Sequence, residues 1–197
     1  MIAFKGFTPE LTSRLGDGNA KNCTFKPGAT MRSEKSKTAR TGYHCCENPA
    51  ECLAYYPWDG KNRFWMVEAS GDIDEDEYER IACTKITLLE ELTPASFAAN
   101  CIRYICEHPQ RKNWQQDRRG VQIKKEQAEA DAEGNIAIAR GEHPRVKGVE
   151  GSILGLIVEK DGKIIGVKGI NVAGKNQKYA NKWLTINEEK AVVVIEK

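Results

Sequence analysis

Residues 42–57, GYHCCENPAECLAYYP, carry the clearest structural signal in the chain. Asn48 is a residue type that caps helix N-termini, Pro49 suits the first helical position, and Glu51 stands where it can bond back to the cap. Pro57 ends the helix, because proline lacks an amide proton and clashes with the preceding turn. The stretch therefore predicts a short helix between this cap and this proline.

The flanking sequence adds strands and a second helix. Residues 2–7 form an apolar run that is typical of a first strand, and residues 64–70 and 81–89 alternate in the manner of two strands of one sheet. Thr93-Pro94 repeats the cap-and-proline signal and opens an apolar stripe at helical spacing that ends before Pro109. These elements predict a small mixed α+β domain over residues 1–110.

The second half of the chain has a different character. Residues 111–133 are hydrophilic without a sustained apolar stripe, which indicates a polar connector or an exposed helix. Beyond them Gly134, Gly141 and Gly148 recur every seven residues, a spacing that suggests a few rungs of a β-roll or β-solenoid. We expect a β-rich, glycine-spaced module over residues 134–197.

A β-meander follows the glycine-spaced segments. Two longer apolar strands are joined by Asp161-Gly162, a strong two-residue hairpin signal. Two more short strands follow near residues 182–186 and 191–195. Because so short an array cannot cover its own ends, we expect either this meander or another subunit to cap it, and a trimer is the form we expect if subunits do.

Composition narrows the class of protein without naming a partner. The 197 residues are 40% hydrophobic and 29% charged, with a net charge of +2, so overall charge does not favour nucleic acid. The seven cysteines are an odd number without common zinc spacing, so we expect free thiols and no metal. There is no export signal and no apolar run near the ~18 residues of a membrane span. We expect a cytoplasmic protein without membrane contact.

The central motif resembles an uncharacterised family encoded by phages and prophages. The family pattern is G-[FY]-H-x-C-E-N-P-x-x-C-L-x-Y-Y, and this chain supports it further with FKGF at residues 4–7 and EASGDI at residues 68–73. This chain departs from the usual family motif at two positions: Tyr43 replaces Phe, and Cys45-Cys46 replaces the typical Ala-Cys. In that family a glycine-spaced C-terminal module often follows, so the resemblance covers nearly the whole chain. It implies a phage or prophage origin and a cytoplasmic role in the infected or lysogenic host, but no assigned reaction.

A second, fainter likeness is to ADP-ribosyltransferases. In those folds a first strand ends in a basic residue beside glycine, and a later Gly-aromatic strand leads into a helix bearing tyrosine. The resemblance implies NAD as the cofactor, with a glutamate orienting a ribose hydroxyl; without it we expect no cofactor. The catalytic candidates are Lys5, Tyr43, Tyr56 and Glu90, with Glu68 and Glu91 as alternatives for the glutamate.

Aromatic residues are dense around the motif. Half or more of them must fill the core, and the rest favour a surface for a protein partner over a nucleotide pocket. The partner-binding candidates are Tyr55, Trp58, Trp65 and Trp114. Walker, dinucleotide-glycine, HExxH and serine-elbow motifs do not occur in the sequence.

Three functions remain open at this point. We favour a non-enzymatic phage accessory protein that binds a host or phage protein and inhibits a host defence factor. The alternatives are an NAD-binding ADP-ribosyltransferase-like enzyme and an oligomeric structural module.

Overall fold

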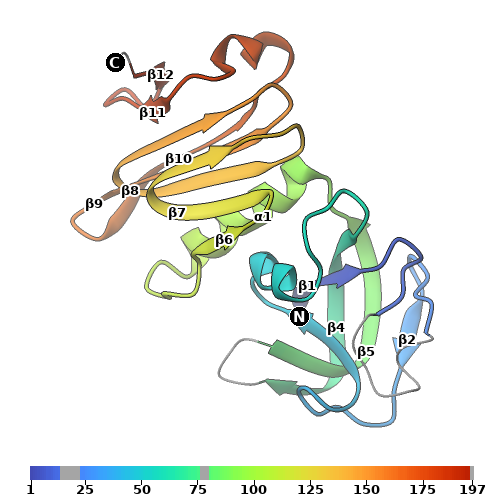
Figure 1. The fold of residues 1–197 in the computed structure, drawn as a ribbon. Coiled ribbons are helices and arrows are strands. Elements are labelled where there is room, and N and C mark those ends of the chain that lie inside the picture. The colour runs from blue at the N-terminus through green and yellow to red at the C-terminus, as the bar shows by residue number, and fades with distance from the viewer. Residues whose placement is uncertain (14–22, 76–79, 196–197) are drawn as a thin grey trace. The chain divides into compact units, whose positions relative to one another are not determined.

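A computed structural model of the chain describes residues 1–13, 23–75 and 80–195, and it is mostly β (Figure 1). The chain divides into two compact units, Met1–Thr93 and Pro94–Lys197. The α+β class expected for the N-terminal domain is wrong. Within the described part of the first unit the predicted motif helix is only a short 3-10 helix, and the longer helix belongs to the second unit.

The first unit is a small β-barrel. β1 (Ile2–Phe7) pairs antiparallel with β3 (Tyr43–Cys46) on one side and with β4 (Arg63–Glu75) on the other. β5 (Arg80–Glu91) pairs with both β3 and β4, and these pairings close the barrel. β2 (Thr30–Arg32) lies along β5 beyond the end of β3. The expected strands at residues 2–7, 64–70 and 81–89 are confirmed, and the last two do share a sheet.

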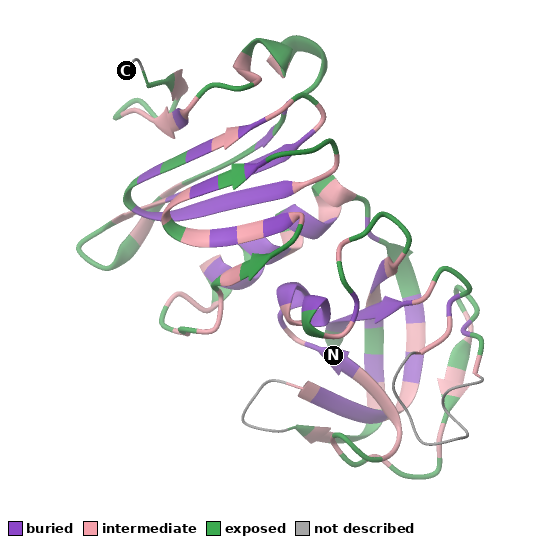
Figure 2. Cartoon of the chain, viewed as in Figure 1, coloured by how far each residue is buried: buried purple, intermediate pink, exposed green. Residues whose placement is uncertain are grey.

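The interior of the barrel is apolar. Phe7 is fully buried and meets the ring of Phe25 edge to face at 4.9 Å, while Val67, Ile86 and Leu88 come from β4 and β5. Every β1 residue after Ile2 is buried, as the purple band along this strand in Figure 2 shows. Such burial on both faces indicates that something other than solvent covers the outer face of β1.

The covering element is the motif segment. η1 (Pro49–Ala54) begins at Asn48, whose side-chain oxygen accepts a hydrogen bond from the Ala50 amide at 3.0 Å, with proline at the start as the sequence predicts. The chain then places the Tyr56 ring directly on Gly6 of β1. A Cβ atom on Gly6 would lie 2.3 Å from Tyr56 Cδ2, so this contact requires glycine.

The second unit begins with the predicted helix, α1 (Pro94–Glu107), and continues as a mixed sheet. β7 (Val121–Ala130), β8 (Ile136–Gly148) and β9 (Ile153–Lys160) run parallel in that order. β10 (Lys163–Asn171) returns antiparallel to β9 through the predicted Asp161-Gly162 turn. The remaining elements are β6 (Gln116–Arg118), η2 (Gly174–Tyr179), β11 (Leu184–Ile186) and β12 (Val192–Val194).

The centre of the sheet in the second unit, formed by β9 and the first half of β8, is buried on both faces. Ile102 of α1 reaches Gly155 of β9, where an added Cβ would lie 2.8 Å from Ile102 Cδ1. On β8 Ala137 and Ala139 belong to a second buried cluster with Leu154 and Leu156 of β9. Two-sided burial explains why these strands are apolar along most of their length.

The polar connector expected at residues 111–133 is wrong, because most of this segment is β6 and β7. β7 buries Val121 and Ile123 and then Ala128 and Ala130, so its alternation changes phase half-way. The change occurs at Glu126, which has a φ of 62° and interrupts the pairing with β8. A strand that switches phase and buries alanine looks polar and aperiodic in sequence. The helix α1 also lies in the C-terminal compact unit, whereas the sequence grouped it with residues 1–110.

No helix among the described residues is both long and apolar enough to cross a bilayer.

Candidate functional site

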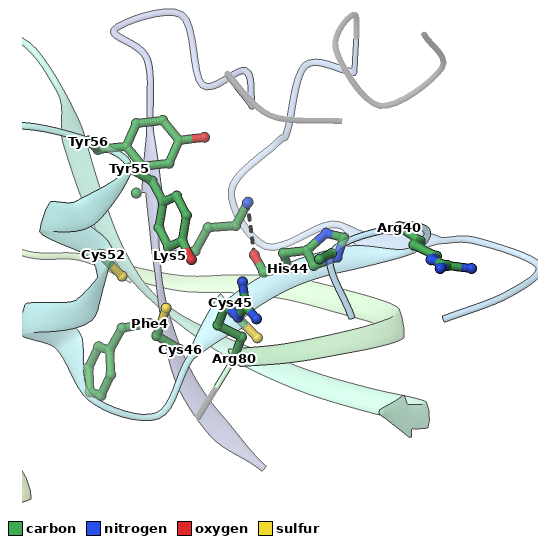
Figure 3. Close-up of a pocket in the computed structure, with 12 residues that line it drawn as sticks. Phe4, Lys5, Arg40, His44, Cys45, Cys46, Cys52, Tyr55, Tyr56 and Arg80 are labelled. Carbon is green, nitrogen blue, oxygen red and sulfur yellow. Dashed lines mark hydrogen bonds between the residues drawn. The ribbon is translucent and has the colours of Figure 1, made fainter. Parts of the chain in front are cut away.

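The main cavity of the first unit opens between β1, β3 and the motif helix (Figure 3). Its volume is about 560 Å³, within the range of small-molecule sites. The contacting residues Gly6 and Tyr56 form part of its wall, and the loop before β3 forms another part. Its lining residues are Phe4, Lys5, Gly6, Ala39, Arg40, His44, Cys45, Cys46, Cys52, Tyr55, Tyr56 and Arg80.

Lys5 is the unusual residue of this pocket. It is 6% exposed, although it carries an ammonium group on a strand whose neighbours are apolar. Its Nζ donates to the His44 carbonyl at 2.8 Å and lies 5.2 and 5.6 Å from the ring centres of Phe7 and Phe25. Burying a charge is costly unless it is paired. Among the described residues, Lys5 has no ion pair with a carboxylate.

The charge around the pocket is one-sided. Arg40 comes from the loop before β3 and Arg80 from the start of β5, and both line the cavity with Lys5. No aspartate or glutamate is among the described residues that line it. In a partly enclosed site the effective dielectric constant is low, so these cations create a strong positive potential. Every charged side chain that the described residues contribute to the lining is therefore basic, apart from the titratable His44.

The pocket wall also carries thiols in two contacting pairs. Cys45 hydrogen-bonds with Cys83, and this contact together with burial raises the pKa of Cys45, while the same contact lowers the pKa of Cys83. Cys46 hydrogen-bonds with Cys52, and that contact and burial raise the pKa of Cys52. All are free cysteines, as the sequence predicts. No group of three or more His, Cys, Asp or Glu side chains suited to a metal occurs in the described part of the chain.

The structure brings some of the predicted catalytic residues together and separates others. Lys5 and Tyr56 both line the pocket. Tyr43 does not: its hydroxyl donates to the Arg32 carbonyl at 2.9 Å, and its ring packs on Phe25 in the barrel. Glu90 is exposed on β5 and outside the cavity.

The alternative glutamates are also outside the cavity. Glu68 is exposed on β4, opposite Ile2, and Glu91 accepts bonds from the Arg63 guanidinium at 2.6 Å. Lys5, Tyr43, Tyr56 and a glutamate therefore do not converge on one pocket.

The aromatic partner-binding candidates are also dispersed. Tyr55 lines the pocket beside Tyr56. Trp58 is half-buried and stacks on Phe64 at 5.2 Å, whereas Trp65 is buried in the barrel core. Trp114 lies in the second unit, where the Arg140 guanidinium sits 5.0 Å from its ring centre. These four residues do not form one shared surface in the first unit.

Of the lining residues, sequence reasoning selected Lys5, Tyr55 and Tyr56 as site candidates. The charged and thiol residues that it missed include Arg40, Arg80, Cys46 and Cys52. The two cysteines had a signal, since they flank the helix cap in the motif. Arg40 lies two residues before the motif, but no recognisable pattern marks it as a site residue. Arg80 lies far from the motif in sequence and comes opposite Cys46 only when β5 pairs with β3.

Residues 1–100 match a family described as a domain of unknown function (DUF7666). The chain belongs to this family. The matched region of the DUF7666 protein contains the whole barrel and its pocket, together with the first turns of α1. Neither the curated proteins nor the solved structures contain a significant match to it.

Proposed function

We propose that the barrel of this DUF7666 protein binds an anionic small molecule that carries a planar group, and that the protein acts by binding. The observation that carries the proposal is the buried Lys5 ammonium in a cavity lined by further cations and no carboxylate. A bound phosphate or carboxylate would supply the counter-charge that the described residues do not give to Lys5.

The tyrosines indicate the second half of the ligand. Tyr55 and Tyr56 line the cavity beside Lys5, and Figure 3 shows their rings on the same side of the pocket as the lysine. Aromatic side chains with a nearby cation suit a ligand with a flat ring next to a negative group. A nucleotide has this combination and fits a cavity of about 560 Å³.

We favour binding over group transfer because the described residues place no carboxylate in the pocket lining. Transfer from NAD in the expected manner needs a carboxylate near the ribose, and no described lining residue is acidic. We therefore propose NAD as one candidate ligand of the pocket. ADP-ribosyl transfer from NAD is the second candidate function. Detection of transferred ADP-ribose on any protein would reverse this preference.

The test is calorimetry and thermal unfolding with ADP, NAD and pyrophosphate, with uncharged adenosine as the reference ligand. At 100 times its dissociation constant a ligand specific for the folded state adds about 2.7 kcal/mol, a large shift in melting temperature. Lys5→Met should weaken binding about 10- to 100-fold, the value of a charge-assisted hydrogen bond. Lys26→Met, at an exposed position of the same unit, is the matched control. Equal binding by both variants, or none by any anion, would refute the proposal.

The wider role we propose follows from the motif resemblance to phage and prophage proteins. We infer an accessory protein that works in the cytoplasm of the infected host and meets a host or phage protein, with inhibition of a host defence factor as its effect. Co-purification of one host protein with the wild-type chain, and its loss with a pocket variant, would support this role. Incorporation of the protein into virions would contradict it.

For the second unit we propose a short β-roll that self-associates. The proposal is supported by an irregularity in the pairing of β7 with β8. Lys125 pairs with Arg140, but two residues later Gln127 pairs with Arg145, so the register shifts there, as it does at the corner of a β-roll rung. β10 also exposes Ile165 and Val167, at 48% and 39%. Light scattering that gives a trimer mass would support the proposal, and the mass of a 22.0 kDa monomer would contradict it.

A further inference from the structure

Cys46 and Cys52 are two thiols that different elements bring together on the pocket wall. Cys46 ends β3, and Cys52 lies in η1, on the other side of the Asn48 cap. Their side chains share a hydrogen bond, and Figure 3 shows both sulfur atoms in the cavity wall below Lys5. Both line the cavity but are only 5% and 2% exposed, so the pocket is the route by which a small reagent would reach them.

We infer that Cys46 and Cys52 form an oxidation site, at which a hydroperoxide entering the pocket converts the two thiols into one intramolecular disulfide. The inference rests on the juxtaposition of the sulfurs and on their access from the cavity. It does not require that the pocket bind an anion.

The roles of the two sulfurs follow from their contact. The pKa of Cys52 is raised by its hydrogen bond with Cys46 and by burial, so Cys52 keeps its proton and donates it toward Cys46. We therefore assign the first attack on the peroxide to Cys46 and the second attack to Cys52. The Lys5 ammonium is close enough to lower the pKa of Cys52 in part, so its charge also acts on this pair.

The reaction balances in two steps. The Cys46 sulfur attacks one peroxide oxygen, the O–O bond breaks, and the other oxygen leaves as water or an alcohol with a thiol proton, which gives a sulfenic acid. The Cys52 sulfur then attacks the Cys46 sulfur, the S–O bond breaks, and a second water leaves with the remaining thiol proton. Two sulfurs are oxidised and one peroxide is reduced.

The neighbouring pair, Cys45 and Cys83, is less suited to this reaction. These residues lie on paired strands in a diagonal relation, because Tyr43 faces Cys83 and Cys45 faces Ile81. Diagonal neighbours in a sheet are about 7–8 Å apart, beyond the usual Cα separation of a disulfide of roughly 4.4–6.8 Å. Cys83 also does not line the cavity.

The test is hydrogen peroxide treatment of the full chain, alkylation of the remaining thiols in denaturant, and peptide mapping. Trypsin leaves Cys45, Cys46 and Cys52 in one peptide, residues 41–61, which should lose about 2 Da and escape alkylation at two positions. Cleavage after Glu47 and Glu51 should then leave residues 41–47 and 52–61 joined until dithiothreitol separates them.

Two variants identify the sulfur. Cys45→Ala should retain the link and Cys46→Ser should lose it, with circular dichroism used to confirm that each variant is folded. A link from residues 41–61 to residues 81–85, which carry Cys83, would overturn the inference. So would full alkylation of residues 41–61 after peroxide treatment, a result from the wild-type chain that no folding defect can explain.

Discussion

Replacing Gly6 by alanine tests the contact that positions the motif segment on the barrel. The added Cβ would lie 2.3, 2.6 and 2.9 Å from Cδ2, Cγ and Cβ of Tyr56. These atoms belong to the base of a ring that is 5% exposed, so the ring cannot swing aside as the end of a flexible chain would. The ring must leave Gly6, or β1 must shift.

The expected cost can be worked from two opposing effects. Overpacking of a well-packed site costs about 1–3 kcal/mol. The backbone of Gly6 does not have a positive φ, so alanine also lowers the entropy of the unfolded chain and returns about 0.4–1 kcal/mol. The two ranges leave a net destabilisation between about 0 and 2.6 kcal/mol, with a central value of about 1.3 kcal/mol. That central value lowers the melting temperature of a domain of this size by roughly 5–10 °C.

Thermal and denaturant unfolding of both proteins measure this difference. Gly169→Ala is the matched control, since Gly169 is also a strand glycine without positive φ and an added Cβ there meets nothing within 4 Å. In Gly6→Ala/Tyr56→Ala the clash is absent, so the two changes should be strongly non-additive. A melting temperature for Gly6→Ala equal to that of the wild type would refute the assigned packing of Tyr56 on β1.

Two other predictions concern carboxylates. Hydrogen bonds from the Thr38 hydroxyl and amide, with Lys37, lower the pKa of Asp74 to about 2, so its stabilising effect is present above about pH 4 and is lost as the pH falls toward 2. Asp74→Asn should therefore flatten the decline of stability across that interval in acid titrations, and an unchanged slope would contradict the assignment. In the second unit Glu126 accepts hydrogen bonds from the amides of Glu142 and His143, each at 3.1 Å. Glu126→Ala should lower the free energy of unfolding by about 1–3 kcal/mol in denaturant melts, whereas Glu129→Ala on the same strand should change it by less than about 1 kcal/mol.

Local signals predicted most of the elements. The strand at residues 2–7, the pair over 64–70 and 81–89, helix α1 and the Asp161-Gly162 hairpin are all present, because each depends on neighbouring residues. The motif cap at Asn48 is present for the same reason. The prediction of a polar connector over residues 111–133 was wrong, because the burial pattern changes phase at the Glu126 bend. No local rule anticipates a positive φ at a glutamate.

The candidate site was predicted only in part. Lys5, Tyr55 and Tyr56 were selected from the sequence and do line the pocket. Tyr43 was selected with them, but its ring packs on Phe25 and its hydroxyl donates to the Arg32 carbonyl, so it does not line the pocket. The sequence order shared with ADP-ribosyltransferases could not show which face each residue would occupy.

The sequence by itself determined the strands at residues 2–7, 64–70 and 81–89, the capped motif turn and helix α1, since these follow from short-range pattern. Only the tertiary structure decided that β5 closes a barrel against β3 and β4, and closure is what brings Arg80 to the pocket that holds Lys5. It likewise set Cys46 beside Cys52 through the turn between them. The position of Arg80 depends on the register of β5 against β3, which is fixed by packing across the whole unit and not by neighbouring residues.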